Sequence, residues 1–377
     1  MSVCPKFQEF EVEAFMSEFE QTVEYVFAES GVHPMKLSEL IDTKEKQQTL
    51  LDTELNYPEV NGEKALRKSI ADLYGEKDLD KVLVTVGASE SNYILAQCLL
   101  EPGDHVAILQ PTYRQFWGAA KNLGAEISSF KLVEERQWEL DIRSLDEAVG
   151  PKTKVIALVN PNNPTGRALS EPEVAAIVSA ARKCGAWLIA DEVYAGAERQ
   201  GDEETPSFYG RYEKCISVGS LSKAYGLPGL RLGWAIGPKE IIDKAWRHHE
   251  YVTISSTMLS NRLAREALSR ETRPRILART RKYIREGWPL VLEMVSKHCE
   301  LLSVVPPDAS AMCFLKYNVD IDSISLAKRL AKEKSILVVP GAYFGQESHI
   351  RFSFALPHKM LKEGLDRLIA LLLEIRN

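Results

Sequence analysis

The stretch S-L-S-K-A-Y-G-L-P-G-L-R-L-G-W, residues 220–234, decides how the rest of the sequence is interpreted. Its one lysine, Lys223, follows Ser220 and Ser222 and precedes a run rich in glycine and proline that ends at Arg231. Such a run favours a tight, non-helical path. Hydroxyl groups and a planar guanidinium suit an oxyanion. The stretch therefore predicts an amine held beside a binding site for a dianion.

An amine in this position meets the needs of pyridoxal phosphate (PLP). Lys223 would form a Schiff base with the cofactor, and the serines and Arg231 would hold its phosphate. A rival interpretation is serine acyl transfer, because Ser220-x-x-Lys223 is also the nucleophile motif of those enzymes. That class also requires K-T-G and S-D-N strings, which this sequence lacks. A lysine taken alone is most often a solvated surface charge, so the rest of the chain must decide.

Composition limits the classes of protein that fit. A chain of 377 residues can bury a large core and is long enough for two domains. Its net charge of −6 offers no basic field, which argues against nucleic acid as a partner. The polar N-terminus and the lack of a long apolar run predict a cytoplasmic protein without a membrane partner. Without a C-x-x-C motif, no metal site is expected, and the cysteines are interpreted as buried free thiols: Cys4, Cys98, Cys184, Cys215, Cys299 and Cys313.

Short apolar runs alternate with helical patterns through the middle of the chain. The predicted strands cover residues 82–86, 105–109, 126–130, 155–159, 187–190, 215–218 and 232–236. This alternation predicts an α/β fold with a mainly parallel sheet flanked by helices. Ligands of such sheets bind beyond the carboxyl ends of the strands, where the polar residues named below all fall.

The two ends of the chain have different patterns. Residues 10–27 have apolar residues near helical spacing and predict a helical N-terminal arm, and residues 37–51 predict one helix. Beyond residue 300, the predicted strands are 301–305, 311–317, 336–339 and 349–354, with helices at 324–333 and 359–375. We therefore expect a smaller α+β domain built from the C-terminal part and the arm. The predicted boundaries are 1–36 for the arm, 37–280 for the large PLP-binding domain and 281–377 for the small domain.

The polar groups at the strand ends match the parts of the cofactor. Asp191 can hold the pyridine nitrogen, Asn163 and Tyr194 the phenolic oxygen, and Tyr113 can stack on the ring. Each has a simpler interpretation when taken alone, such as a helix cap for Asp191. For the phosphate, the candidates combine backbone N–H groups, hydroxyls and a guanidinium: Gly87, Ala88, Ser89, Ser220, Ser222 and Arg231.

Taken together, these strings resemble the class I/II aminotransferase family of fold-type I PLP enzymes, the aspartate aminotransferase superfamily. The matching strings are N-P-T-G at 163–166, D-E-V-Y at 191–194, S-L-S-K through G-L-R-L-G-W, G-A-S at 87–89, P-x-Y ending at Tyr113 and Y-P-x-x-x-G at 57–62. The resemblance implies Lys223 as Schiff-base lysine and proton shuttle, with Asp191 and Tyr194 as its catalytic partners. It also implies a homodimer with shared active sites, in which Tyr57 reaches the phosphate of the partner's cofactor.

The resemblance also implies residues that bind the substrate. Arg351 matches the family arginine that holds the α-carboxylate, and Asn163 lies with it. The family's glycine segment is replaced here by E-S-G-V-H-P, residues 29–34, where Gly31 would offer its backbone to the carboxylate. The sequence shows no obvious second arginine for the substrate, and such an arginine would have indicated a dicarboxylic substrate. Four aromatic residues could line an apolar pocket: Tyr25, Phe27, Trp117 and Tyr343.

The expected reaction moves an amino group from an α-amino acid to a 2-oxo acid. Transamination needs only Lys223 to move a proton, so it is the default. Fold resemblance does not fix the reaction, and C–S β-lyase, decarboxylase, cyclase and oxidase chemistry remain alternatives. A PLP-binding regulator is a further alternative, although the sequence has no appended DNA-binding segment.

Overall fold

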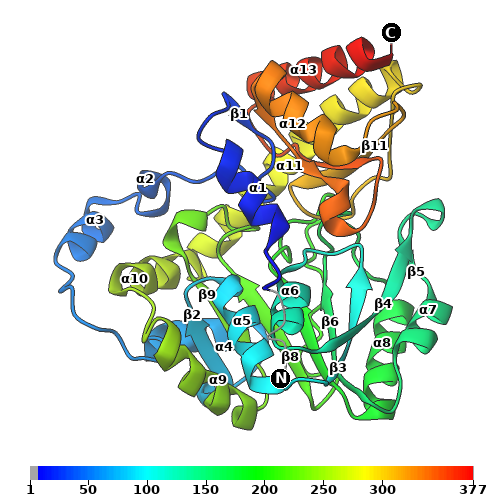
Figure 1. Ribbon diagram of the computed structural model, residues 1–377. Coiled ribbons are helices and arrows are strands. Elements are labelled where there is room, and N and C mark those ends of the chain that lie inside the picture. Colours follow the sequence, from blue (N-terminus) through cyan, green and yellow to red (C-terminus); the bar gives the residue numbers. More distant parts are fainter. Residues whose placement is uncertain (1–6, 377) are drawn as a thin grey trace.

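The computed structural model describes residues 7–376, so Cys4 and the first six residues of the predicted arm lie outside it. Its largest element is an eight-stranded sheet in the order β2-β9-β8-β7-β6-β3-β4-β5 (Figure 1). The strands are β2 (Val82–Thr85), β3 (His105–Gln110), β4 (Glu126–Val133), β5 (Glu139–Leu140), β6 (Thr153–Val159), β7 (Trp187–Asp191), β8 (Cys215–Ser220) and β9 (Gly233–Ile236).

The central strands of this sheet run parallel, as predicted. Strands β8, β7, β6, β3 and β4 pair in parallel, whereas β9 is antiparallel to both β8 and β2. The register sets Asp191 of β7 beside Val159 of β6 and Val218 of β8. Three strand ends therefore meet at one edge, and the segments that follow them start side by side.

Helices cover both faces of the sheet. Alternate residues of β3 pack into separate cores, Val106 and Ile108 into one and Ala107 and Leu109 into the other. Helices α5 (Ala88–Leu99), α6 (Gln115–Asn122) and α9 (Lys239–Val252) pack on the first core. The second core is covered by α4 (Lys64–Leu73), α7 (Ile142–Ala148), α8 (Glu171–Cys184) and α10 (Met258–Ala267). Helix α9 was not predicted from the sequence.

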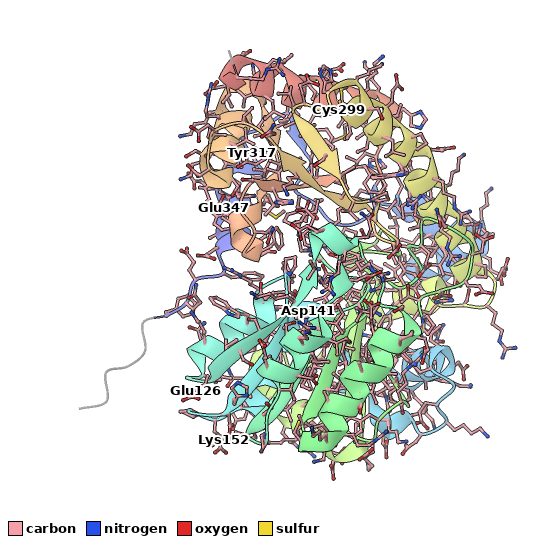
Figure 2. The ribbon with its side chains drawn as sticks, turned by 90° about the vertical axis from the view of Figure 1, so that its right-hand side faces the viewer. Glu126, Asp141, Lys152, Cys299, Tyr317 and Glu347 are labelled. Carbon is pink, nitrogen blue, oxygen red and sulfur yellow. The ribbon has the colours of Figure 1, made fainter. Side chains whose placement is uncertain are left out.

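A smaller α+β unit lies above the large sheet in Figures 1 and 2. Its antiparallel sheet has the order β10-β11-β14-β13. The strands are β10 (Leu302–Val304), β11 (Met312–Tyr317), β13 (Val339–Pro340) and β14 (His349–Ser353), and the helices are α11 (Thr272–Lys297), α12 (Ser323–Lys334) and α13 (His358–Arg376). Strand β1 (Tyr25–Val26) pairs with β12 (Ile336–Leu337), which joins the N-terminal arm to this unit as predicted.

Three local expectations were wrong. The amphipathic helix α1 spans only Glu11–Phe19, because the later part of the predicted segment pairs as β1. Residues 37–51 form two helices, α2 (Leu37–Leu40) and α3 (Lys44–Leu51), because the backbone leaves the helical conformation at Ile41 and Thr43 caps the second helix by accepting a hydrogen bond from Lys46 N. Cys299 is exposed near the top of Figure 2, so it is not a buried thiol.

Helix α11 continues without a break across the predicted domain boundary between residues 280 and 281, and the predicted boundaries remain predictions. Within residues 7–376, no helix is both long and apolar enough to cross a membrane.

Candidate active site

A cavity of about 480 Å³ lies beyond the carboxyl ends of β6, β7 and β8. Its wall combines residues from the large sheet, the small unit and the N-terminal arm. The predicted site residues that line it are Ala88, Ser89, Tyr113, Asn163, Asp191, Tyr194, Ser220, Ser222, Lys223, Arg231 and Arg351. The fold therefore brings eleven of the predicted site residues to one cavity.

Lys223 reaches this cavity from the loop that follows β8. Burial lowers the pKa of its ammonium, and the nearby Arg351 and Arg231 charges act in the same direction. The carboxylate of Glu29 lies 3.8 Å from Lys223 Nζ and opposes that effect. A partly buried amine with a lowered pKa gives up its proton more easily than a surface lysine does.

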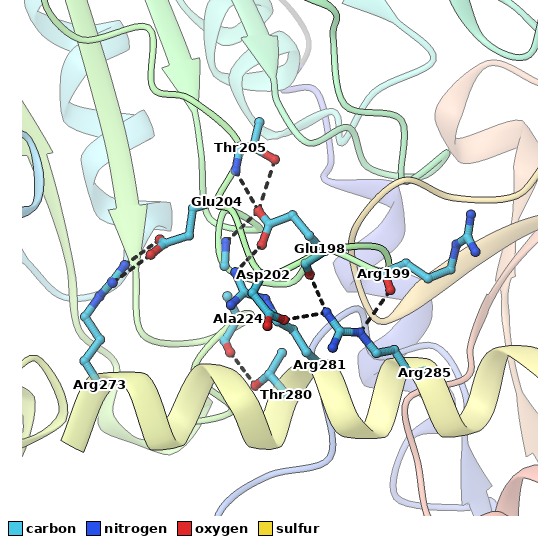
Figure 3. Close-up of polar contacts among 12 residues, drawn as sticks. Glu198, Arg199, Asp202, Glu204, Thr205, Ala224, Arg273, Thr280, Arg281 and Arg285 are labelled. Carbon is cyan, nitrogen blue, oxygen red and sulfur yellow. Dashed lines mark hydrogen bonds and ion pairs between the residues drawn. The ribbon is translucent and has the colours of Figure 1, made fainter. Parts of the chain in front are cut away.

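The backbone around Lys223 is held from two sides. The backbone N–H of Val32 faces the Lys223 carbonyl at 3.5 Å, and a Cβ on Gly31 would lie 3.1 Å from the Ser222 carbonyl. On the other side, Thr280 Oγ1 of α11 donates to the Ala224 carbonyl at 2.6 Å (Figure 3). Gly31 thus packs against the lysine loop, and it does not line the cavity.

Helix α11 is itself anchored by ion pairs to the segment after β7, which Figure 3 shows. Arg281 pairs with Glu198 at 2.8 Å, and both side chains are about nine-tenths buried. Arg273 forms two hydrogen bonds with the carboxylate of Glu204. These contacts fix the helix that supports the residue next to Lys223.

Asp191, the last residue of β7, lies in the cavity wall. Burial raises the pKa of its carboxyl to about 6, whereas hydrogen bonds from Asn92 Nδ2 at 2.8 Å and from Val193 N at 3.3 Å favour the ionised form. A cation placed against this carboxylate would further favour ionisation. The sequence analysis missed Asn92, although it lies one helical turn after Ser89 and so shares its face.

A chain of hydrogen bonds links Asn163, Tyr194, Ser30 and Arg351. Asn163 Nδ2 donates to Tyr194 OH at 3.0 Å, and the hydroxyl donates to Ser30 Oγ at 2.9 Å. Arg351 Nη1 donates to Asn163 Oδ1 at 3.0 Å, and Nη2 donates to the Ala28 carbonyl at 2.5 Å. Arg351 is 2% exposed, and its buried Nε has no partner among the described residues. An unsatisfied buried N–H of this kind is suited to a carboxylate.

The predicted phosphate-binding residues form a cradle at the start of α5. Gly87 has φ of +79°, which favours glycine, and a Cβ there would lie 2.8 Å from Arg231 Nη2, so a larger residue would displace the guanidinium. Arg231 Nη1 is 3.4 Å from Ser222 Oγ, and Ser220 Oγ is 2.9 Å from the same hydroxyl. The first N–H groups of a helix lack intrahelical partners. This donor set fits the phosphate of PLP.

The remaining wall comes from the N-terminal arm. Tyr113 OH donates to Glu13 of α1 at 2.6 Å, and the Tyr113 ring meets Phe10 edge-on at 5.0 Å. Burial raises the pKa of the Tyr113 phenol well above its usual range. Glu13 and Glu29 both line the cavity, and the sequence analysis singled out neither for the site.

Several predicted residues lie outside the cavity. Gly87 is not part of the cavity wall but lies beside Arg231, which is, and Tyr57 is 81% exposed and is not part of the cavity wall of its own chain. The expected aromatic pocket is wrong: none of Tyr25, Phe27, Trp117 and Tyr343 lines the cavity. Phe27 is instead buried against Phe352, with ring centroids 4.6 Å apart.

The geometry argues against serine acyl transfer. Ser220 Oγ is within hydrogen-bond distance of Ser222 Oγ and the Leu232 carbonyl, whereas Lys223 Nζ faces Glu29. A Ser-Lys pair would need the amine to accept the proton of the hydroxyl.

Comparisons with known proteins agree with the site. Residues 33–368 match the family model described as aminotransferase class I and II. A PLP-dependent aminotransferase from Streptococcus suis 89-1591 has a similar structure, with a TM-score of 0.91 and 31% identity over 99% of both chains. The PLP-dependent cyclase OrfR gives a TM-score of 0.87 and 26% identity over 99% of this chain and 100% of its own. Nicotianamine aminotransferase 1 of Oryza sativa subsp. japonica is 26% identical over 83% of this chain and 67% of its own length.

The fold and the site together define a fold-type I enzyme that depends on pyridoxal phosphate. Within that class, the chain belongs to the aminotransferase class I and II family, since the family model covers most of its length. It is thus a PLP-dependent aminotransferase by family, and its substrates are a separate question.

Proposed function

We propose that this protein moves an amino group from an α-amino acid to a 2-oxo acid, with Lys223 forming the Schiff base and moving the proton. The observation that carries the proposal is the shared cavity of Lys223, Asp191 and Arg351, which come from three distant parts of the sequence. Each supports a different requirement of transamination: a proton carrier, a partner for the ring nitrogen, and a grip on the carboxylate.

The bound cofactor would supply an electron sink for the bonds around the substrate Cα. The chain's own residues hold and orient the reacting groups. In this proposal, Arg231, Ser220, Ser222 and the start of α5 bind the phosphate, and Asn163 and Tyr194 donate to the phenolic oxygen. The Tyr113 ring covers one face of the cofactor ring.

Lys223 carries the proton step in this proposal. Only a neutral amine can accept a proton, and burial favours that form by lowering the pKa of Lys223. A general base works best when its pKa lies near the working pH. Arg351 would fix the substrate carboxylate by two parallel hydrogen bonds, so that the Cα proton is presented to Lys223.

Cyclisation is the second candidate, because one structural relative is named a PLP-dependent cyclase. In this proposal, a cyclisation would use the same cavity and the same Lys223. The test is a screen of amino donors and 2-oxo acceptors with the purified holoenzyme, followed by absorbance spectra of each half-reaction. Transamination predicts one 2-oxo acid per cofactor converted to its amine form. A product that retains the amino nitrogen within a ring would support the cyclase instead.

We also propose a cytoplasmic homodimer. Large apolar side chains are exposed on the segments around residues 51–57 and 251–254: Leu51, Leu55, Tyr57, Tyr251 and Ile254. An exposed apolar surface of this kind favours association, and two-fold dimers are the commonest oligomers. The free cysteines among the described residues are compatible with a reducing compartment.

A further inference from the structure

Two carboxylates in the wall of the cavity have no cationic partner among the described residues that stays charged during the proposed reaction. Glu13 comes from α1, and Glu29 comes from the segment after β1; both are exposed toward solvent and both line the cavity. Glu13 accepts a hydrogen bond from Tyr113 OH at 2.6 Å. Glu29 faces Lys223 Nζ at 3.8 Å. Because the phenol of Tyr113 is neutral, it does not balance the negative charge of Glu13. The charge of Glu29 is balanced only while Lys223 is protonated.

During the proposed reaction, Glu29 loses its positively charged partner, because Lys223 must be neutral to accept a proton. Lys223 can accept the substrate proton only as a neutral amine, and in that form it no longer offsets the charge of Glu29. The other cations of the cavity, Arg231 and Arg351, are assigned to the phosphate and to the substrate carboxylate, and Asp191 to the ring nitrogen. The substrate carboxylate and Asp191 are each matched by one positive charge, and the phosphate dianion uses the whole charge of Arg231. No cation of the cavity wall formed by residues 7–376 is therefore left for Glu13 and Glu29, which keep an excess of negative charge.

The cavity also has apolar surface for a long side chain. Its volume of about 480 Å³ is shared by the cofactor and the substrate, so a long side chain would extend toward the exposed side of the cavity, where Glu13 and Glu29 lie. Phe10, Met16 and Val193 share the wall with the two carboxylates. An unbranched chain of methylene groups that ends in a cation would cover such apolar surface and place its charge near solvent.

We infer that the substrate is an α-amino acid whose side chain ends in a positive charge, an ammonium or a guanidinium group, which Glu13 and Glu29 recognise. The inference rests on the proposed function, because it uses Arg351 as the site of the α-carboxylate. The same two carboxylates would repel a substrate with a second carboxylate, and the described part of the cavity wall has no arginine besides Arg231 and Arg351, which are already assigned, to bind one.

The test measures binding of carboxylates that have no amino group and so cannot react. Calorimetry with the holoenzyme compares 5-guanidinopentanoate, pentanoate and hexanedioate, which share a carboxylate but differ in the charge at the far end. We expect the guanidino compound to bind about tenfold or more tightly than pentanoate, and hexanedioate to bind most weakly. Glu13→Gln and Glu29→Gln should each reduce that preference by about fivefold. Glu18→Gln, which removes a charge from the same helix outside the cavity, should leave it unchanged.

Two results overturn the inference: pentanoate or hexanedioate binding as tightly as the guanidino compound, or a preference that survives both Gln substitutions. Arg351→Lys separates this failure from a failure of the proposed function. If it weakens all three ligands while the preference is absent, carboxylate binding stands and only the substrate class is wrong. If it changes none of them, the assignment of Arg351, and with it the proposed function, is wrong. Raised salt should reduce the preference, because screening weakens exposed charge pairs.

Discussion

Arg351 Nη1 donates a hydrogen bond to Asn163 Oδ1 at 3.0 Å, which joins strand β14 of the small unit to the loop after strand β6 of the large sheet. The same Asn163 donates to Tyr194 OH. Arg351, which we propose binds the substrate carboxylate, and the groups assigned to the cofactor therefore form one connected network. A substrate held by Arg351 would therefore be positioned relative to the cofactor through the side chain of Asn163.

Arg351→Lys should raise the KM for amino acids by about a hundredfold while leaving PLP content unchanged, because an ammonium cannot form the bidentate pair. Steady-state kinetics and cofactor absorbance measure the two quantities on the same sample. Simple amines without a carboxylate serve as the control, since Arg351 should not affect them. If such amines prove as good substrates as amino acids, the assignment of Arg351 is wrong.

Gly87→Ala should weaken PLP binding, because the added methyl group would lie 2.8 Å from Arg231 Nη2 and the backbone there has a positive φ. Cofactor titration of the variant, followed by absorbance, measures the loss. Gly103→Ala is a matched control, since that glycine also has a positive φ but has open space around its Cα. Equal PLP affinity in the two variants would contradict the phosphate cradle.

Asp191→Asn should retain PLP but slow the half-reaction by more than about a hundredfold, because a neutral amide cannot hold a proton on the ring nitrogen. Stopped-flow spectra of the holoenzyme measure this rate. Turnover near that of the wild type would contradict the role of Asp191.

The same substitution has an effect on stability whose sign follows from the pKa. Burial raises the pKa of Asp191 from 3.8 to about 6, so the folded protein without cofactor holds a proton that the unfolded chain releases in this interval. The contribution of this group to the free energy of unfolding is therefore greatest below pH 4 and falls as the pH rises through 6. The loss amounts to at most about 3 kcal/mol, from roughly two pKa units. Asp191→Asn should raise the Tm of cofactor-free protein at pH 8 and not at pH 4; thermal unfolding at the two pH values tests this.

Tyr57 should act in the site of the partner subunit. Tyr57→Phe and Lys223→Ala chains, each impaired alone, are unfolded together and refolded as mixed dimers. If Tyr57 acts across the interface, one site of the mixed dimer has intact Lys223 and intact Tyr57, and it should recover wild-type kinetics. If Tyr57 acts within its own chain, mixing recovers nothing beyond the Tyr57→Phe level. A monomer at assay concentration, measured by light scattering, would also end this proposal.

Most of the large sheet could be predicted because its signals are local. Runs such as 155–159 are apolar and β-branched, and the turns after them carry glycine and proline. Helix α9 was missed although Ile241, Ile242 and Ala245 form its buried face, because charged residues and histidines between them obscure the period. Strand β1 was assigned to a helix because its partner, β12, lies some three hundred residues away in the sequence. Local periodicity carries no information on such a pairing.

The site could be predicted where residues follow strand ends, because the fold places those ends together. Lys223, Asp191 and Asn163 are of this kind. Glu13, Glu29 and Ser30 were missed because the arm reaches the cavity only through packing, such as the edge-on contact of Phe10 with Tyr113. Phe10 and Tyr113 belong to segments that are far apart in the sequence and share no motif, so the sequence alone could not predict their contact.

The most direct test of the account is reduction of the holoenzyme with borohydride, followed by peptide mapping. The purified protein should be yellow, and reduction should fix the pyridoxyl group on the peptide that contains Lys223. Lys223→Ala should bind PLP without covalent attachment and should lack the half-reaction. Covalent label on another lysine, or a colourless protein that does not respond to added PLP, would contradict the account.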